Sequence, residues 1–541
     1  MGQGGGDGGD LVEAGGRRTL LIDLNQADGA LELEGEVCVI GAGAAGITLT
    51  RRLLAAGRTV VLLESGGFDY EAPVAGLNAG ENVGEDYYDL EDARLRFFGG
   101  TTAIWGGRCA EFDPIDLEKR EYVPHSGWPI AYAELESWYR EARPLFGLPE
   151  ERPSPETFRK AGVPLPKFEE LETPLWTFDR RFNRFAWESC ADLEADPKFQ
   201  IVSHATVTRI VQMDGGIERV EARALGAGRL TVNAKAFVLA AGGIENPRLL
   251  LASGIGNGHD QVGRYFMEHP HARGGRIVKG AAWPLLKAFG RRHRIGGQDL
   301  AALIAPGKAL QRREGILNTS LTVVARQPQG RRQFVGMKAY SGLKHSMAPT
   351  RKGRALWMMT KKAAGWAQRH VDPARPWLLH KLGSVDVALL VRAEQAPNPD
   401  SRVTLKAERD ATGVPRVALD WRLSEIDVRS VSVLVETLGR ELQRLGLGKV
   451  EPAEWLSSGR WQTDPLISSH PIGGYHHMGT TRMGDDPKTS VTDADGRVHG
   501  VGNLWVAGSS LFPTGSWANP TLTIAALALR SADRISRELG Q

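Results

Sequence analysis

The stretch Val37-Cys38-Val39-Ile40-Gly41-Ala42-Gly43-Ala44-Ala45-Gly46 joins four apolar residues to a glycine-rich turn. A continuous apolar run of this kind predicts a strand buried on both faces of a parallel sheet. Residues 47–56 then predict a helix, and residues 59–63 predict a second buried strand that ends in Glu64. The order of strand, glycine turn, helix, strand and acidic residue predicts a dinucleotide-binding unit.

The chemistry of a dinucleotide explains why these residue types occur in this order. Glycine allows a tight turn and lets the backbone approach a pyrophosphate, which the helix N-terminus binds. Glu64 lies 18 residues after Gly46, and its carboxylate can accept hydrogen bonds from the adenosine ribose. The predicted cofactor contacts in this unit are Gly41, Gly43, Ala44, Ala45, Gly46, Glu64 and Ser65.

A second glycine-rich segment distinguishes FAD from NAD, which the first turn does not. Phe98-Gly99-Gly100-Thr101-Thr102-Ala103-Ile104-Trp105-Gly106-Gly107 places four glycines around two threonines and a tryptophan. Such a loop lets backbone N–H groups approach an extended cofactor, and a nicotinamide enzyme has no obvious use for it. We therefore expect FAD, with contacts from Gly100, Thr101, Thr102, Trp105, Gly106 and Gly107.

Two later apolar runs predict that the cofactor domain is discontinuous. Residues 237–243 and 503–510 both read as buried strands that run into glycine, and the second should return to the same sheet. Asn246-Pro247, after the first run, predicts the cap and first turn of a helix. Close approach to the cofactor is expected at Ala241, Gly242, Gly508 and Ser509.

His476 is the candidate catalytic base, within His476-His477-Met478-Gly479-Thr480-Thr481-Arg482-Met483-Gly484. An alcohol that loses a hydride must also lose its hydroxyl proton, and a neutral imidazole, with an ordinary pKa of about 6.5, accepts protons at neutral pH. Adjacent side chains of an extended segment point to opposite faces. We therefore expect His477 to pack behind the site, although it stays a candidate substrate contact.

Asn519 is the second candidate catalytic residue. Asn519-Pro520-Thr521 precedes an apolar run that predicts a buried helix, with Asn519 as the N-cap and Pro520 at the first helical position. The partial positive charge of that N-terminus would stabilise an anionic reduced cofactor. Asn519, Pro520 and Thr521 are therefore predicted cofactor contacts. A pure N-cap with no catalytic part is the alternative interpretation of Asn519.

In this order the motifs resemble the glucose–methanol–choline (GMC) family of FAD-dependent alcohol oxidoreductases, over about residues 35–535. The resemblance implies that His476 is the base, that Asn519 hydrogen-bonds the substrate oxygen, and that Val207 contacts adenine. Some relatives bond FAD covalently through a histidine in the second loop. The counterpart here is Ile104, so we expect non-covalent FAD.

Trp105-Gly106-Gly107, Ser126-Gly127-Trp128-Pro129 and the His/Asn pair are similar to the branch of pyranose oxidases, sugar dehydrogenases and glycoside 3-oxidases. The resemblance implies oxidation of a secondary hydroxyl of a sugar or glycoside to a ketone. Residues 394–402 are a turn-rich segment between two expected strands, from which Gln395 could hydrogen-bond a sugar hydroxyl; an ordinary hairpin is the alternative. Sterol, aryl or aliphatic alcohols and an FAD-containing lyase remain alternatives. The electron acceptor (O2, a quinone or a redox protein) and a homo-oligomer also stay open.

The resemblance implies an α/β protein: a Rossmann-like FAD-binding domain and a second, α+β substrate domain built on an antiparallel sheet. The expected organisation is a Gly-rich tail (1–18), FAD-binding parts (19–125, 195–275, 465–541), a linking and cap segment (126–194) and a substrate domain (276–464). Residues 351–381 are rich in Lys, Arg, Trp and Met. They predict a lid, a membrane-surface helix or a docking segment, and we expect a solvated lid with its aromatics packed inward.

Composition excludes several other classes of protein. A formal charge of +3 over 541 residues is too small for a nucleic-acid surface, and no such motif occurs. Three cysteines without CxxC spacing predict neither a disulfide framework nor a metal site. Arg17-Arg18 resembles a twin-arginine signal but lacks its apolar core, and no run is long enough to span a bilayer. A soluble, cytoplasmic protein is therefore expected.

Overall fold

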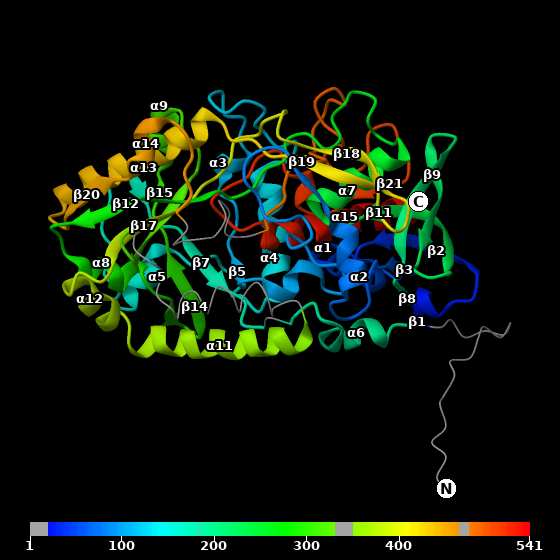
Figure 1. Cartoon of the computed structure of the whole chain (residues 1–541), viewed down its shortest axis with the longest axis horizontal. Helices are drawn as coiled ribbons and strands as arrows, with labels where there is room; N and C mark the ends of the chain where they lie inside the picture. Colours follow the sequence, from blue (N-terminus) through cyan, green and yellow to red (C-terminus); the bar gives the residue numbers. More distant parts are fainter. Residues whose placement is uncertain (1–19, 182, 330–349, 465–474, 541) are drawn as a thin grey trace, which may run out of the picture.

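The apolar run at residues 37–40 forms the end of a long strand, β2 (Ala30–Ile40), near the middle of an eight-stranded sheet. This computed structural model describes residues 20–181, 183–329, 350–464 and 475–540. The four apolar residues are at most 4% exposed, as expected for a strand covered on both faces. Figure 1 shows this sheet at one end of an elongated molecule and a second sheet at the other.

Strands of the large sheet come from three distant parts of the chain. Their order is β1 (Leu21–Asp23), β8 (Phe199–Ser203), β3 (Val60–Leu63), β2, β11 (Arg229–Leu239), β10 (Gly216–Arg223) and β9 (Thr206–Met213), and β21 (Leu504–Val506) also pairs with β11. All pairs from β1 to β11, and the β11–β21 pair, are parallel, whereas β10 and β9 extend the sheet antiparallel. The predicted Rossmann-like, discontinuous sheet is confirmed.

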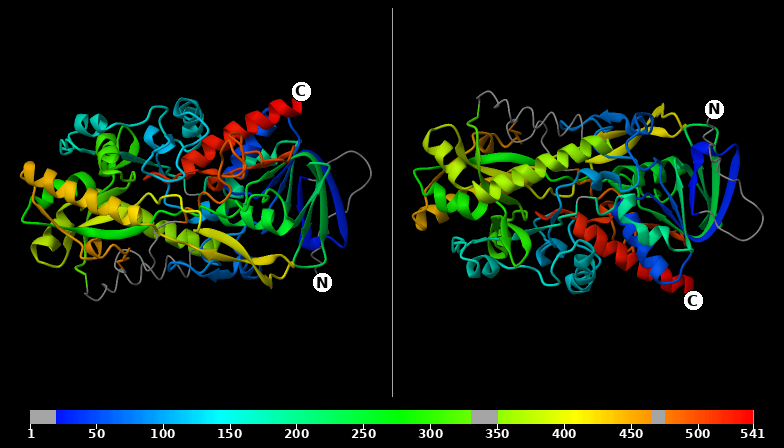
Figure 2. Two further views of the ribbon diagram at one scale, coloured as in Figure 1. Left: turned by 90° about the horizontal axis from the view of Figure 1, so that it is seen from above. Right: turned by 90° about the horizontal axis from the view of Figure 1, so that it is seen from below.

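Helices from both ends of the chain cover this sheet. The first, α1 (Ala44–Ala55), packs beside α15 (Thr521–Gly540), and α15 packs in turn on α4 (Tyr132–Leu145) (Figure 2). A hydrogen bond of 2.8 Å joins the hydroxyls of Tyr139 and Thr523 across the last contact. The C-terminal helix is therefore part of the same layer as the first βαβ unit.

The expected cap at Asn246-Pro247 is wrong, because α7 (Gly242–Ser253) begins four residues earlier and contains Pro247. The Asn246 side chain accepts a hydrogen bond from the Ala241 backbone N–H (2.8 Å) and donates one to Ser510 Oγ (3.0 Å). It therefore ties the end of β11 to the residues after β21, instead of capping a helix.

The second domain is built on an antiparallel sheet, as predicted. Its strand order is β16 (Ser320–Arg326), β17 (Asp386–Arg392), β12 (His271–Val278) and β20 (Lys449–Pro452). The amphipathic helix α13 (Glu425–Arg444) packs on it and buries Val431, Leu434, Val435 and Leu438 completely. The exact limits of the domains stay predictions.

Smaller elements surround these two sheets. Two further antiparallel groups are β13 (His293–Ile295), β14 (Gln298–Ala302), β7 (Leu175–Phe178), β5 (Arg108–Cys109), and β15 (Ala305–Pro306) with β6 (Leu171–Glu172). A mixed sheet holds β18 (Arg402–Arg409), β19 (Pro415–Asp420) and β4 (Gly80–Asn82). Short helices are α2 (Ala72–Ala75), α3 (Pro114–Leu117), α5 (Pro155–Lys160), α6 (Ala191–Glu194), α8 (Ala282–Phe289), α9 (Lys308–Glu314) and α14 (Trp455–Ser458).

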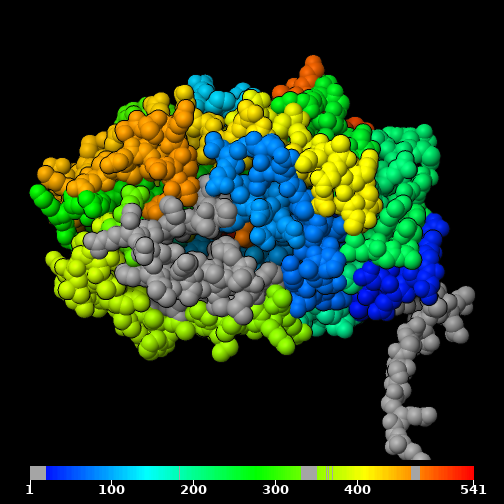
Figure 3. Space-filling model, in the orientation of Figure 1, coloured from blue at the N-terminus to red at the C-terminus, as the bar shows by residue number. Residues whose placement is uncertain are grey.

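The basic segment forms two helices, α11 (Arg351–His370) and α12 (Ala374–Lys381), on the outside of the molecule. In Figure 3 the yellow-green atoms of this segment line one edge of the visible face. Met359 is 68% exposed and Trp366 57% exposed, so the expected inward packing is wrong for these two side chains. Trp377, in α12, does pack on Trp283, with 5.7 Å between ring centroids.

Within the described ranges, no helix combines the length and apolarity that crossing a membrane would require. In the same ranges no three His, Cys, Asp or Glu side chains gather as metal ligands would. The thiols of Cys38, Cys109 and Cys190 are buried and free of disulfide bonds. Both the Gly-rich tail and Arg17-Arg18 lie outside the described residues.

Candidate active site

The two glycine-rich loops meet at the N-terminus of α1. The Gly99 backbone N–H donates a hydrogen bond to the Ala42 carbonyl (2.8 Å), and a Cβ on Gly100 would lie 3.6 Å from the Cα of Gly43. Gly43 is the N-cap of α1, and no side chain caps this helix. A Cβ built on Gly43 or on Gly242 would meet nothing within 4 Å. Open space beside an uncapped helix N-terminus fits the pyrophosphate of a dinucleotide.

Glu64 holds the first loop in shape. Its carboxylate accepts hydrogen bonds from the backbone N–H groups of Ala42 (2.9 Å) and Gly66 (3.1 Å). Burial raises the pKa of Glu64, and these backbone donors oppose that change. Next to it, Ser65 Oγ lies 2.7 Å from Thr206 Oγ1, one residue before Val207 on β9. The hydrogen bond between Ser65 and Thr206 thus places the predicted ribose contact, Glu64 after β3, near the predicted adenine contact, Val207 on β9.

The second loop uses its threonine hydroxyls internally. Thr101 accepts a hydrogen bond from the Leu95 N–H (3.2 Å), and the Thr102 hydroxyl donates to the Gly99 carbonyl. The ring of Trp105 packs on Phe146, with centroids 5.8 Å apart. A cofactor contact from this loop would therefore come mainly from its backbone, in line with the high content of glycine. Gly106 and Gly107 continue the loop into β5.

The C-terminal part of the chain reaches the same place through β21. Gly508 follows it with φ +113, which favours glycine, and a Cβ there would lie 3.9 Å from the Cβ of Ala45 in α1. Ser509 donates a hydrogen bond from Oγ to the His477 carbonyl (2.6 Å). These contacts bring the segment that contains His477 toward the glycine turn. Ala241 and Gly242 follow β11, and Pro520 and Thr521 stand at the start of α15.

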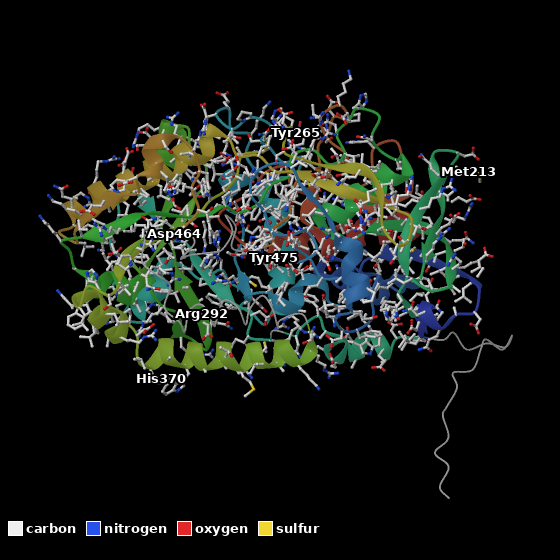
Figure 4. All side chains as sticks on the ribbon, in the orientation of Figure 1. Met213, Tyr265, Arg292, His370, Asp464 and Tyr475 are labelled. Atoms are coloured by element: carbon white, nitrogen blue, oxygen red, sulfur yellow. The ribbon has the colours of Figure 1, made fainter. Side chains whose placement is uncertain are left out.

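The two candidate catalytic side chains are direct neighbours. His476 Nε2 lies 3.1 Å from Asn519 Nδ2, and His476 Nδ1 lies 2.8 Å from the Nδ1 of His269. Helix α15 begins at Thr521 and its first backbone hydrogen bond runs from Ile524 to the Pro520 carbonyl, so the predicted N-cap at Asn519, with Pro520 at the first helical position, is wrong. Figure 4 places Tyr475, the residue before His476, near the middle of the molecule.

Sequence reasoning missed the segment that supports His476. Backbone hydrogen bonds of 3.0 Å join Met267 and Met478 in both directions, and they place Glu268 and His269 beside His476. The Glu268 carboxylate accepts hydrogen bonds from the Tyr87 hydroxyl (2.6 Å) and from the His476 backbone N–H (3.0 Å). The available signal was a pair of histidines around a proline, His269-Pro270-His271.

The environment keeps these imidazoles neutral. Burial holds the pKa of His476 well below its ordinary value, and the neighbouring His269 and the Arg392 guanidinium lower it further. Burial also lowers the pKa of His269 to about 4. Arg392 Nη1 lies 2.9 Å from His271 Nε2, and the guanidinium sits 5.1 Å from the ring centroid of Trp176. The site therefore contains the positively charged Arg392 guanidinium close to uncharged imidazoles.

Contacts of His476 select one tautomer. If Nδ1–H donates to His269, the other ring nitrogen, Nε2, carries a lone pair and can accept from the Asn519 amide. Both contacts are then satisfied, whereas the opposite tautomer would place two donors face to face at Asn519. An unprotonated Nε2 is the form that a general base needs.

The two candidate substrate contacts, Gln395 and His477, both contact other parts of the protein in this structure. Gln395 is fully buried; its amide accepts from the Glu268 N–H and Trp421 Nε1 (both 2.9 Å) and donates to the Arg422 carbonyl (2.8 Å). Its oxygen thus accepts two hydrogen bonds from the protein and its amide nitrogen donates one. The ring of His477 packs behind His476, 5.8 Å from Phe266, as the alternation of side chains predicts.

Replacing Glu268 by Gln should change how stability depends on pH. Burial raises the pKa of Glu268 to about 8, against an ordinary value of 4.5 in the unfolded chain. Between these values the folded state holds the proton more firmly, so the wild type loses stability as pH rises. From about pH 4.5 to about pH 8 the melting temperature of the wild type should therefore fall relative to that of Glu268→Gln. Glu436→Gln, an exposed carboxylate on α13, is the control and should show a constant difference.

Comparison with known proteins gives consistent matches along the chain. Residues 397–528 match the family model described as GMC oxidoreductase, and residues 36–284 match FAD dependent oxidoreductase. A 2-methyl-1,2-propanediol dehydrogenase of Mycolicibacterium austroafricanum is 26% identical, over 93% of this chain and 95% of its own. A C-glycoside 3-oxidase of Arthrobacter globiformis is 28% identical, over 64% of this chain and 54% of its own.

The fold is also found in a solved structure. The crystal structure of pyridoxine 4-oxidase from Mesorbium loti aligns with a TM-score of 0.52 at 17% identity, over 92% of this chain and 99% of that one. The two family models cover the segments that form the glycine loops and the candidate catalytic pair, His476 and Asn519. The chain therefore belongs to the GMC oxidoreductases, and it is an FAD-dependent enzyme that oxidises CH–OH groups of alcohol- or sugar-type substrates.

Proposed function

We propose that this enzyme oxidises a secondary hydroxyl of a sugar or glycoside to a ketone, with His476 as the base. The observation that carries the proposal is the contact of His476 Nε2 with the Asn519 amide at 3.1 Å, in a site that keeps the imidazole neutral. Such a pair supplies one proton acceptor and one hydrogen-bond donor for the same alcohol oxygen.

Each side chain has a distinct part in this reaction. His476 Nε2 takes the hydroxyl proton, while the Asn519 amide donates a hydrogen bond to the oxygen and cannot compete for the proton. His269 fixes the orientation and tautomer of the His476 ring through the 2.8 Å contact of the two Nδ1 atoms. FAD held at the glycine loops would supply the acceptor for the hydride that leaves the carbon. The proton can then leave through an imidazolium whose pKa burial keeps low.

Two observations support a sugar or glycoside as substrate. One motif that resembles the sugar-oxidising branch contacts the residues before Asn519: Trp128 donates a hydrogen bond from Nε1 to Thr514 Oγ1 (2.7 Å). A C-glycoside 3-oxidase is also among the relatives. The alternative of an aliphatic alcohol is supported by the propanediol dehydrogenase, so one experiment must include both classes.

Anaerobic absorbance of the flavin at about 450 nm, recorded with glycosides, free sugars, diols and aryl alcohols, tests the proposal. We expect a glycoside or sugar to bleach the flavin. Bleaching by a diol alone would replace the sugar with an aliphatic alcohol, and no bleaching by any member would contradict the redox assignment of these substrates. Admitting air afterwards separates an oxidase from an enzyme that needs a quinone or a redox protein.

We also propose that FAD is bound without a covalent bond and that the protein works in the cytoplasm. Ile104 cannot form a covalent bond to the flavin, and the three cysteines are free thiols, as a reducing compartment allows. Acid precipitation should therefore release all of the yellow cofactor into the supernatant. Flavin that stays in the protein pellet would contradict non-covalent binding.

A further inference from the structure

Helix α11 carries its apolar stripe on the outside. Leu356, Met359, Ala363 and Trp366 follow one another at spacings of three and four residues, and all four are exposed; the polar and exposed His370 continues the row. Side chains at these spacings share one face of a helix. A surface helix normally turns such a face toward the core, so this arrangement requires a partner outside the described part of the chain.

Exposed apolar side chains are concentrated in this region. Of the eleven large apolar side chains that are exposed among the described residues, seven lie here: Trp283, Leu356, Met359, Trp366, Val371, Leu378 and Leu382. Their exposed fractions range from 39% to 68%. Lys352 and Lys362 of α11 are also exposed. These two lysines and the seven apolar residues are named the outer face.

The segment also carries a strong excess of positive charge. Residues 351–382 contain eight Lys and Arg against one acidic residue, Asp372, a formal charge of +7 in a chain whose total is +3. Two copies docking through this face would bring like charges together, which opposes self-association. An anionic partner is complementary to it.

Contacts with the rest of the protein hold α11 at its start and just beyond its end, so the position of the outer face is fixed relative to the body. At its start, Asp69 accepts hydrogen bonds from the Arg351 backbone N–H (3.0 Å) and from Arg354 Nη1 (2.8 Å). Beyond its end, Trp377 of α12 packs on Trp283 of α8. Figure 4 shows side chains projecting from α11 away from the body, with the labelled His370 near its end.

We propose that the outer face binds the surface of an anionic lipid bilayer, with α11 lying in the membrane plane. Helices that do this combine Trp, Leu and Met on one side with flanking Lys and Arg, and their binding adds apolar burial to attraction for anionic headgroups. Trp366, Met359 and Leu356 would enter the headgroup region, while Lys352 and Lys362 would contact lipid phosphates. The membrane would hold the enzyme in one orientation.

Flotation of the FAD-bound protein with lipid vesicles tests this inference. We expect binding to vesicles that contain about one third phosphatidylglycerol, little binding to pure phosphatidylcholine, and release in about 1 M salt, where the screening length is about 3 Å. The paired changes Met359→Ser/Trp366→Ser and Lys352→Glu/Lys362→Glu should each weaken binding at least about ten-fold. Flavin absorbance of each variant checks that it is folded.

Matched controls lie elsewhere on the surface. Met213→Ser removes a methionine that is 55% exposed at the opposite end of the molecule (Figure 4), and Lys488→Glu reverses an exposed lysine. Both should bind vesicles as the wild type does. Equal binding by the outer-face variants, or no binding of the wild type to anionic vesicles, would overturn the proposal. So would a dimer in light scattering that Met359→Ser/Trp366→Ser converts to a monomer, because the face would then join two copies.

Discussion

His476→Ala is expected to remain yellow and folded while its flavin is reduced by substrate at least about a hundred-fold more slowly, the usual effect of losing a general base. The ring of His476 contacts Asn519 and His269, whereas the glycine loops that hold the cofactor lie on other segments. The change should therefore affect the rate of reduction much more than the FAD content. Anaerobic stopped-flow measurement of flavin bleaching gives both quantities in one experiment.

The pH dependence of flavin reduction in the wild type provides a second test of the role of His476. Because burial and the neighbouring cation hold the pKa of His476 well below its ordinary value, the imidazole is already neutral at pH 7. Protonation would remove the base, so the reduction rate should be constant through neutral pH and fall only in distinctly acidic solution. His259→Ala, an exposed histidine, is the control. Near-normal reduction in His476→Ala would remove this histidine from the mechanism.

Gly46→Ala and Gly43→Ala should fail in different ways, although they are three residues apart in the same turn. A Cβ on Gly46 would lie 1.9 Å from the carbonyl oxygen of Gly41, which is backbone and cannot yield without moving the turn. A Cβ on Gly43 meets no protein atom within 4 Å, and φ −87 at this residue suits alanine. The first change distorts the protein, whereas the second only narrows the space where the pyrophosphate is expected.

We therefore expect Gly46→Ala to lose FAD and to unfold at a lower temperature even as apoprotein, with a loss on the order of 1–3 kcal/mol or more from overpacking. Gly43→Ala should keep the stability of the wild-type apoprotein but bind FAD at least about ten-fold more weakly. Titration of apoprotein with FAD and thermal melting of both forms measure these effects. Unchanged FAD affinity in Gly43→Ala would move the cofactor away from this turn.

The first βαβ unit could be predicted from sequence because its signals are local. Val37 to Gly46 contains both the burial pattern of the strand and the glycines of the turn, and the observed β2 and α1 differ mainly in their ends. His476 and Asn519 also carried recognisable neighbours, and the structure brings their side chains within 3.1 Å. In each case the chemistry is contained in about ten consecutive residues.

Partners that come from distant parts of the chain could not be predicted in this way. His269 and Glu268 stand about two hundred residues before His476, and only the pairing of Met267 with Met478 brings them to the site. Gln395 and Asn246 show the same limit. A turn signal suggested Gln395 as a substrate contact and a cap signal suggested Asn246 as an N-cap. In the structure both amides hydrogen-bond backbone groups, of Arg422 and of Ala241. Which polar groups meet depends on the packing of both sheets.

The position of β21 in the large sheet has a consequence for how the protein is made. The strand pairs with β11 and leads to Gly508 and to α15, which lies against α1. A ribosome that has synthesised only the first 500 residues has released β2, α1 and both glycine loops, but neither the last strand nor His476's neighbour Asn519 has emerged. The nascent chain must therefore keep an incomplete flavin domain until residues 504–540 have emerged, and cofactor loading should come after that point.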